Sequence, residues 1–374
     1  MANSKKRPPR LKLPFVYSLN NRIRNLAMRT MGSFKGRITE ERADLSRERI
    51  EKILLVRATF RMGSSILATP AIFGFRSNFP SARIDIVGSP LSGSLLKNLP
   101  IDHCFSITRR FPHSSWAYLV LLKQIRSVGY DLAVDVSCSQ SAMGSFIVGL
   151  SGARFRAGVE GKWDHGYNIR VPKPAEINKY RVLPAFLAAL GLRTETGFPR
   201  LILSPGEREE GKAKLKSLIE SNHGHVVGVF VGGRSRKGKG WPMAKFRQLI
   251  DGLDRHGVGV VVFFGPEEKK LMGPFGQTLG KNIPLIFEPS ARSFAALVSN
   301  CAVFITWDSG PMHMACALGV RTIAIFPKSK PGRWGPPAEI AKTVGHRASV
   351  EDILELALAE LSPGVIAAGS PSSA

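Results

Sequence analysis

The stretch VFITWDSGPMHMACALG, residues 303–319, carries residue types from which an anion site can be built. An apolar strand ends in Asp308, and small and apolar residues at helical spacing follow. Ser309 can cap that helix, Gly310 lets a ligand approach the backbone, and Pro311 begins the helix without losing a donor. The free N–H groups and the positive end of the helix dipole then favour a diphosphate.

A second loop of this kind lies in KILLVRATFRMGSSILATPAI, residues 52–72. An apolar strand enters a loop that contains Gly63, and apolar residues then resume at helical spacing. The backbone N–H groups of such a turn can face a ligand in a cleft. Ser64 follows the glycine. Because a neutral hydroxyl cannot accept a proton at pH 7 without a base of its own, Ser64 is not a general base by itself.

Short apolar strands alternate with helices from Lys52 onward, which is typical of parallel sheets with right-handed crossovers. In the first half, the predicted elements cover 53–56, 65–79, 83–88, 91–98, 116–128, 131–137, 141–152 and 182–192. In the second half, they include 207–221, 226–231, 244–257, 258–265, 303–307, 311–319, 322–326 and 349–362. We therefore predict an α/β fold of two facing, doubly wound Rossmann-like domains, with ligands in the cleft between their carboxyl edges.

The Pro- and Gly-bearing stretch RTETGFPRLILSPGE is the best candidate for a linker between these domains. We predict one domain over residues 51–203 and another over residues 204–362. Residues 1–50 read as a basic N-terminal extension, and residues 363–374 as a disordered tail.

The charge indicates an anionic partner, because 53 Lys and Arg residues against 28 Asp and Glu residues leave +25. The candidates are nucleic acid, phospholipid and a phosphorylated substrate, and a generally basic surface is the alternative. Nucleic acid is disfavoured because no recognisable nucleic-acid module occurs and the basic residues are scattered among ordinary α/β elements.

The N-terminus lacks the apolar core of a signal peptide, and no uncharged apolar run approaches the roughly 18 to 20 residues that span a bilayer. We therefore expect a cytoplasmic protein. Residues 15–31 have apolar side chains at helical spacing with arginines between them. They fit an amphipathic helix on an anionic membrane, or equally a helix packed on the domain. Peripheral contact through residues 1–40 at the inner face of the inner membrane is thus a hypothesis.

The sequence contains no evident metal or disulfide framework. Cys104, Cys138, Cys301 and Cys316 have no CxxC spacing and no nearby His partner, so they read as small buried residues in a reducing compartment. No Asp-x-Asp occurs either. We therefore expect no metal and no cofactor, and cations and helix dipoles would have to stabilise a diphosphate leaving group.

From about Lys52 to Pro337 the chain resembles glycosyltransferase family 9, the ADP-heptose–lipopolysaccharide heptosyltransferases. Five stretches carry the resemblance in order: KILLVRATFRMGSSILATPAI with the following FPSARIDIVGSP, YDLAVDVSCSQSAMGSFIVGLSGARFRAGVEG, VVGVFVGGRSRKGKGWPMAKF, VVVFFGPEEKK and DSGPMHMACALGVRTIAIFPKSKPGRWGPP. The last is the most specific, since it is close to the family block D-[ST]-G-P-x-H-x-A-x-A-L-G-x-P.

The resemblance implies a fold of the GT-B type, with the acceptor on the first domain and a nucleotide sugar on the second. Lys239 would bind the donor phosphates. Glu268 would accept a hydrogen bond from a ribose hydroxyl, unless it only begins a surface helix, and Asp308 would contact the sugar or hold its loop. The expected donor-binding residues are Gly233, Ser235, Lys239, Glu268, Ser309, Gly310 and His313.

The resemblance also implies that Arg57 and Gly63 belong to an acceptor-side loop, in which an Asp normally follows the Gly as general base. Here Ser64 takes that catalytic position. Another base can serve, the transfer can be dissociative enough to need little base help, or activity has been lost. General-base help is worth about 10² to 10⁴ in rate, so its loss slows an enzyme without ending its function. The alternative bases in the first domain are Asp135, Glu160, Asp164 and His165.

We therefore expect an inverting, metal-independent glycosyltransferase that moves a sugar, foremost a heptose from ADP-heptose, onto a lipopolysaccharide-core or related glycolipid acceptor. The alternative is a non-catalytic relative that binds a nucleotide sugar or glycolipid. An epimerase of the same architecture fits the motifs less well. Arg321 departs from the family block, which has Pro at this position, and is expected on the domain surface.

Overall fold

A computed structural model of the chain describes residues 44–107, 113–139, 141–194, 197–219, 224–232, 241–266, 268–280, 283–326, 331–345 and 347–362. Three predictions fall outside these residues. They concern the membrane segment 1–40, the tail 363–374, and the loop residues Gly233, Ser235 and Lys239.

The first sheet has six parallel strands in the order β3-β2-β1-β4-β5-β6. Its strands are β1 (Lys52–Val56), β2 (Arg83–Gly88), β3 (His103–Ser106), β4 (Leu132–Asp135), β5 (Phe155–Val159) and β6 (Ile169–Val171). Its helices are α2 (Met62–Ile66), α3 (Thr69–Asn78), α4 (Pro90–Leu95), α5 (His113–Val128), α6 (Ala142–Leu150) and α7 (Val182–Ala188). The central strands are apolar and buried because helices cover both faces of the sheet.

The second sheet repeats this topology in the order β12-β11-β10-β7-β8-β9. Its strands are β7 (Val226–Phe230), β8 (Gly259–Phe264), β9 (Leu285–Phe287), β10 (Val303–Trp307), β11 (Arg321–Phe326) and β12 (Lys342–Gly345). Its helices are α8 (Pro205–Lys216), α9 (Met243–Arg255), α10 (Met272–Gly276), α11 (Ala291–Val298), α12 (Gly310–Ala317), α13 (Pro331–Trp334) and α14 (Val350–Glu360). Both strand orders are doubly wound, which confirms the predicted fold class.

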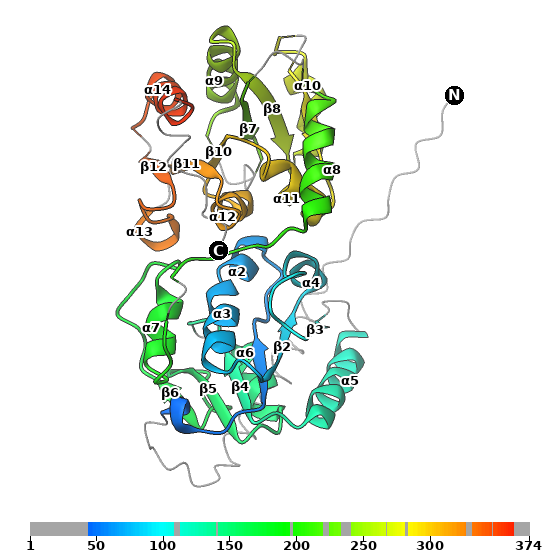
Figure 1. The fold of residues 1–374 in the computed structure, drawn as a ribbon, viewed down its shortest axis with the longest axis vertical. Helices are drawn as coiled ribbons and strands as arrows, with labels where there is room; N and C mark the ends of the chain where they lie inside the picture. Colours follow the sequence, from blue (N-terminus) through cyan, green and yellow to red (C-terminus); the bar gives the residue numbers. More distant parts are fainter. Residues whose placement is uncertain are drawn as a thin grey trace, which may run out of the picture.

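The carboxyl edges of the two sheets face each other. The first sheet fills the lower half of Figure 1 and the second the upper half. Helix α2 follows β1 and α12 follows β10, and these two helices pack together where the halves meet. The topological switch points, between β1 and β4 and between β7 and β10, therefore open toward the same cleft.

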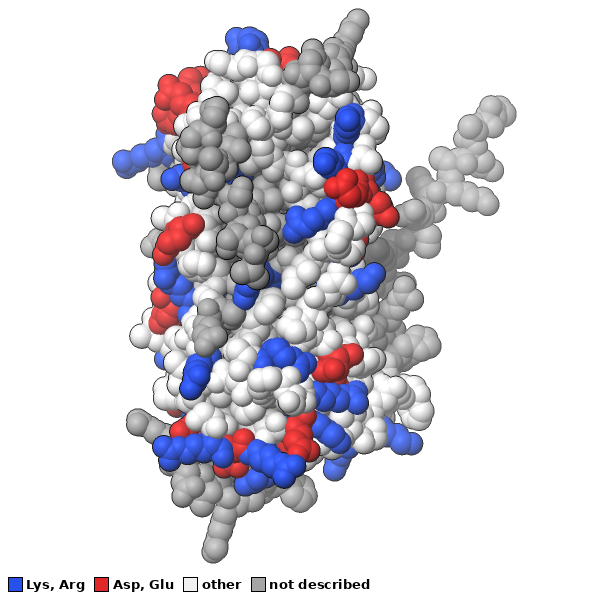
Figure 2. Space-filling view, viewed as in Figure 1, with Lys and Arg blue, Asp and Glu red and all other residues white. Residues whose placement is uncertain are grey.

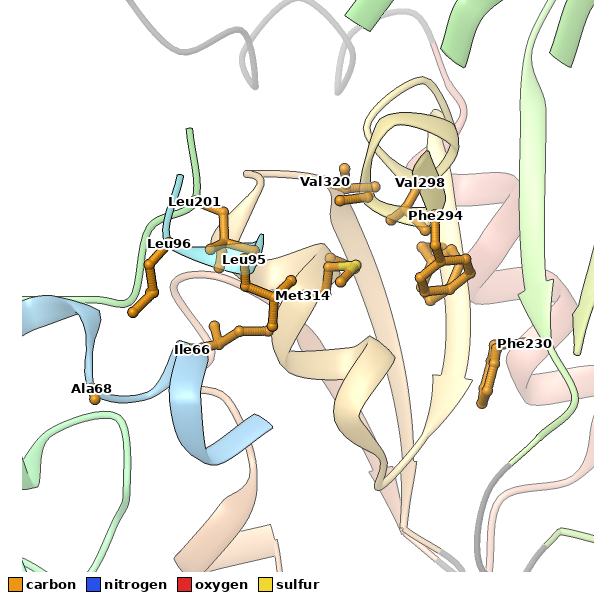
Figure 3. Close-up of a cluster of buried hydrophobic side chains, with 14 of the residues drawn as sticks. Ile66, Ala68, Leu95, Leu96, Leu201, Phe230, Phe294, Val298, Met314 and Val320 are labelled. Carbon is orange, nitrogen blue, oxygen red and sulfur yellow. The ribbon is translucent and has the colours of Figure 1, made fainter. Parts of the chain in front are cut away.

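Apolar side chains also join the two halves. Ile66, Leu95 and Leu201 belong to the same buried cluster as Met314 of α12, and Figure 3 shows them side by side. Such a buried apolar contact favours one fixed arrangement of the domains over free relative motion.

The predicted domain boundary at 203/204 lies in the segment between α7 and α8, and it stays a prediction. Residues of this segment bond to both halves: the N–H of Arg200 donates to Oγ1 of Thr69, and that of Leu201 to the carbonyl oxygen of Ala317. Within the predicted extension, Leu45 is fully buried and bonds to Leu190, so its described end packs on the first domain.

Some element boundaries differ from those predicted. The helix expected over 65–79 is two helices, because Pro70 lies in the first turn of α3 and has no N–H to continue the hydrogen bonding of α2. The short strands β3, β6 and β12 were not among the predicted elements. Among the described helices, none has the length and apolar character that crossing a membrane requires.

Candidate active site between the two sheets

The loop after β1 is held by Arg57. Nε of Arg57 donates to the carbonyl oxygen of Ser64 at 2.9 Å, across the turn that leads into α2. Burial lowers the pKa of Arg57, while the nearby Asp135 opposes this shift. The predicted acceptor-side residue Arg57 therefore ties the loop after β1 to the short helix α2, which contains Gly63 and Ser64, at the switch point of the first sheet.

Asp135 ends β4, opposite Val56 in the sheet register. Its carboxylate accepts from the N–H of Ser137 at 3.0 Å and from the hydroxyl of Tyr167 at 2.8 Å. Burial raises its pKa, and these hydrogen bonds and Arg57 act in the opposite direction. Asp135 is 2% exposed, and its carboxylate is hydrogen-bonded to both partners. It therefore holds the loop after β4, which contains Ser137, against the segment before β6, which contains Tyr167.

A pocket of about 430 Å³ opens at the carboxyl edge of the first sheet. Three cations line it: Lys173 after β6, Lys179 before α7, and Arg333 of α13 in the second half. Burial lowers the pKa of Lys179, and the like charges of Arg333, Arg57 and Lys173 lower it further. A cluster of cations that disfavour one another is suited to an anionic ligand.

The four alternative bases lie in different places. Asp135 is buried as described, whereas Glu160 lines the pocket after β5. Asp164 accepts from the N–H of Gly161 at 3.1 Å, and its carboxylate also lies near His165 and Arg170. Of the four, Glu160 is the one that the pocket includes.

The start of α12 faces the start of α2. Gly310 lies so close to Met62 that an added Cβ would be 3.2 Å from that residue's Cβ. Ser309 occupies the N-cap position, but its hydroxyl pairs with Thr306 at 3.2 Å and does not cap the helix, which corrects the expected cap. The first N–H groups of a helix such as α12 have no acceptor within the helix, which is the property that an anion site uses.

His313 is turned toward the first domain. Its Nδ1 lies 2.6 Å from the hydroxyl of Tyr180, and its ring packs against the backbone of Gly63 so closely that a Cβ there would overlap it. Burial lowers the pKa of His313 to about 4, so the ring is neutral at pH 7. Burial raises the pKa of Tyr180, and nearby Cys316 and Asp308 add to this effect. His313 and Tyr180 thus form a neutral pair across the cleft.

Glu268 lies at the carboxyl ends of β7 and β8. It is 3% exposed, and its Oε2 would be 2.6 Å from a Cβ on Gly232 and 2.8 Å from one on Gly265. A Cβ at either position would therefore displace the end of the Glu268 side chain. The indole N–H of Trp307 donates to the carbonyl oxygen of Gly232, which ties the end of β10 to the end of β7. The predicted donor-side residues Glu268, Asp308, Ser309 and Gly310 therefore surround one switch point.

Several pocket and cleft residues were not singled out from the sequence: Tyr180, Lys173, Lys179 and Arg333. The first three lie in an irregular segment without periodicity, and only the fold brings Arg333 to them. Arg321 is half-buried and donates to the carbonyl oxygen of Glu360 at 2.7 Å, so it anchors the end of α14. Among the described residues, no group of three or more His, Cys, Asp or Glu side chains could hold a metal ion.

Comparison with known proteins shows which family has this sequence and fold. The family model of glycosyltransferase family 9 (heptosyltransferase) matches residues 118–353. The chain belongs to glycosyltransferase family 9. It is 24% identical over 292 residues to lipopolysaccharide heptosyltransferase 3 of Escherichia coli, covering 73% of this chain and 83% of that protein.

Solved structures share the fold. A family 9 glycosyl transferase from Veillonella parvula has a TM-score of 0.72 at 19% identity, covering 88% of this chain and all of that one. The ADP-heptose lipopolysaccharide heptosyltransferase II of E. coli has a TM-score of 0.69 at 19% identity, covering 83% of this chain and 98% of that one. This family 9 protein is therefore a glycosyltransferase with a GT-B fold.

Proposed function

We propose that this family 9 protein transfers a heptose from ADP-heptose to a lipopolysaccharide-core or related glycolipid acceptor. The observation that carries the proposal is the meeting of α2 and α12 across the cleft, because it brings the acceptor-side loop against the donor-side helix start. Relatives of the chain are named as lipopolysaccharide or lipooligosaccharide heptosyltransferases, which supports the choice of sugar and acceptor.

The donor would lie on the second sheet. Glu268 would accept a hydrogen bond from the ribose, and the N–H groups at the start of α12 would bind the diphosphate. Lys239, Ser235 and Gly233 would add contacts from the loop after β7. Since the sequence has no Asp-x-Asp, we propose that these cations and dipoles stabilise the departing nucleoside diphosphate without a metal ion.

The acceptor would lie on the first sheet, with an anionic group in the pocket lined by Lys173, Lys179 and Arg333. Arg57 would hold the turn that carries Gly63 and Ser64 against it. Glu160 is the carboxylate in this pocket that we assign as proton acceptor in place of the usual Asp. Attack from the face opposite the diphosphate would invert the anomeric centre.

A panel of nucleotide sugars tests the proposal. With a delipidated core oligosaccharide as acceptor, ADP-heptose should release ADP and extend the acceptor by one heptose, whereas UDP- and GDP-sugars should not. The competing function, binding without transfer, is motivated by Ser64. It predicts saturable ADP-heptose binding with no release of ADP under any condition.

A further inference from the structure

Helix α5 carries large apolar side chains on its outer surface. Trp116 is 72% exposed, Leu119 60% and Val120 41%. Exposed Lys123 and Arg126 follow them on the same helix. Single exposed apolar residues are ordinary, but three within five residues form a contiguous patch that calls for a partner.

The helical period puts these side chains together. Trp116, Leu119, Val120 and Lys123 are spaced at i, i+3, i+4 and i+7, so they share one face. The opposite face packs Leu121 and Ile125 into the core below the sheet. Helix α5 therefore carries apolar side chains on its outer face as well as its inner face, a pattern typical of a helix that is covered on both sides.

The patch lies at the end of α5 nearest the site. A helix that follows a strand in a right-handed crossover begins at the carboxyl edge of the sheet, and α5 follows β3 in this way (Figure 1). Tyr118, on the inner side of this half, packs on the same cluster as Phe60 of the loop after β1. The exposed apolar end of α5 therefore lies at the carboxyl edge of the first sheet, the edge that also carries the loop after β1.

We propose that Trp116, Leu119 and Val120 insert shallowly into an anionic lipid surface, with Lys123 and Arg126 against its headgroups. Helix α5 contains no Asp or Glu, and the whole chain carries +25, so its charge complements an anionic membrane. Trp is a residue that favours the interfacial region of bilayers. The choice of lipid over another apolar partner rests on the proposed function, whose acceptor is a glycolipid.

Vesicle co-sedimentation of the full chain tests this surface. Wild-type protein should bind vesicles of phosphatidylglycerol and phosphatidylethanolamine more tightly than phosphatidylcholine vesicles, and salt should weaken the binding. The variant Trp116→Ser/Leu119→Ser/Val120→Thr should lose roughly tenfold in apparent affinity. Its matched control is Leu218→Ser/Leu271→Ser, which removes two side chains that are 40% and 42% exposed in the second half and should bind as wild type.

Two readouts keep this result separate from the proposed function. Transfer to a delipidated acceptor should be unchanged in the triple variant, and circular dichroism should show that it is folded. If no acceptor is ever extended but the triple variant still binds vesicles more weakly than wild type, the membrane surface is supported and the proposed function is contradicted. Equal vesicle binding by the triple variant and wild type would overturn the inference. So would loss of a dimer in sedimentation without loss of vesicle binding, since a second copy would then cover the patch.

Discussion

Because Ser64 stands where the family has its general base, the proton acceptor must be another residue, and we look for it in the pocket. The hydroxyl of Ser64 cannot serve as the base, and its backbone carbonyl is already bonded to Arg57. Asp135 is committed to Ser137 and Tyr167, so a substrate would have to displace these partners to use it. Among the four candidate bases, Glu160 is the one that lines the pocket, and this position is the ground for choosing it.

Replacing Glu160 should therefore slow the chemical step. Glu160→Gln should lower kcat by about 10² to 10⁴ with little change in the KM for the donor. Glu176→Gln is the control in the same pocket, since it removes the other carboxylate of the lining, and its effect should be much smaller. Adding Ser64→Asp to the Glu160→Gln variant should restore part of the turnover. Equal rates for both Gln variants would show that Glu160 is not the base.

The burial of His313 makes stability depend on pH. The pKa of His313 falls from 6.5 in the unfolded chain to about 4 in the folded protein. Between these values the unfolded state binds more protons, so stability is full above pH 6.5 and is lost as the pH falls toward 4. The loss is on the order of 3 kcal/mol.

Thermal unfolding of His313→Asn checks this origin. An Asn side chain can keep a hydrogen bond to Tyr180 but does not titrate, so the fall in Tm between pH 7 and pH 4.5 should shrink in the variant. An unchanged fall would assign the acid sensitivity to other groups.

At the scale of elements, the site depends on two helix starts that approach each other through glycine. The ring of His313 occupies the space where Gly63 would carry a Cβ, and Met62 occupies the corresponding space at Gly310. The sequence indicated that both glycines mark ligand loops. It could not show that the loops also face one another, because that contact depends on the docking of two separate sheets.

Gly63→Ala tests this approach. The added methyl group must push α2 away from α12, which should cost about 1 to 3 kcal/mol of stability and lower kcat/KM. Gly273→Ala in α10 is the matched control, since nothing lies within 4 Å of its added Cβ, and it should be neutral or slightly stabilising. If Gly63→Ala kept full stability and activity, the close packing of the two helix starts would not matter.

The predictable elements were those with a strong apolar period. Strands such as β10, with five buried residues, and helices such as α14 were located within two residues. The edge strands β3, β6 and β12 read HCFS, IRV and KTVG, and such short, partly polar segments have no distinct period. The residues of the pocket between β6 and α7 were missed for the same reason, since they lie outside regular elements.

At the scale of the whole molecule, Arg292 of α11 fastens one half to the other. Its guanidinium pairs with Glu207 of α8 and donates to the carbonyl oxygens of Lys97, at 3.2 Å, and Ile202, at 2.9 Å. Hydrogen bonds to Arg292 lower the pKa of Glu207 to about 2. The stability from this pair is present above pH 4.5 and is lost as the pH falls toward 2.

Arg292→Met should therefore destabilise the protein by about 2 to 4 kcal/mol, because it leaves Glu207 and several carbonyl oxygens without this partner. Urea unfolding would measure the loss. Lys214→Met is the control, since it removes a half-exposed ion pair with Glu288 within the second half and should cost less than about 1 kcal/mol. Comparable losses in both variants would argue against a special role for the tie between the halves.

The distribution of charged side chains is also a property of the whole molecule. On the face shown in Figure 2, Lys and Arg residues are distributed over both halves, with Asp and Glu among them. The net charge predicted an anionic partner but not its place. We propose two separate places for such partners: the pocket cations for the anionic acceptor and the end of α5 for a lipid surface.

The central claim is that the two facing sheets form a working heptosyltransferase despite Ser64. The most direct measurement is mass spectrometry of a delipidated core oligosaccharide after incubation with the full chain and ADP-heptose in the presence of EDTA. The account predicts an acceptor that is heavier by one heptose, formed with one equivalent of ADP and at the same rate with or without EDTA. Tight binding of ADP-heptose with an unchanged acceptor would contradict it, and a product formed only when a divalent metal is supplied would refute its metal-independent chemistry.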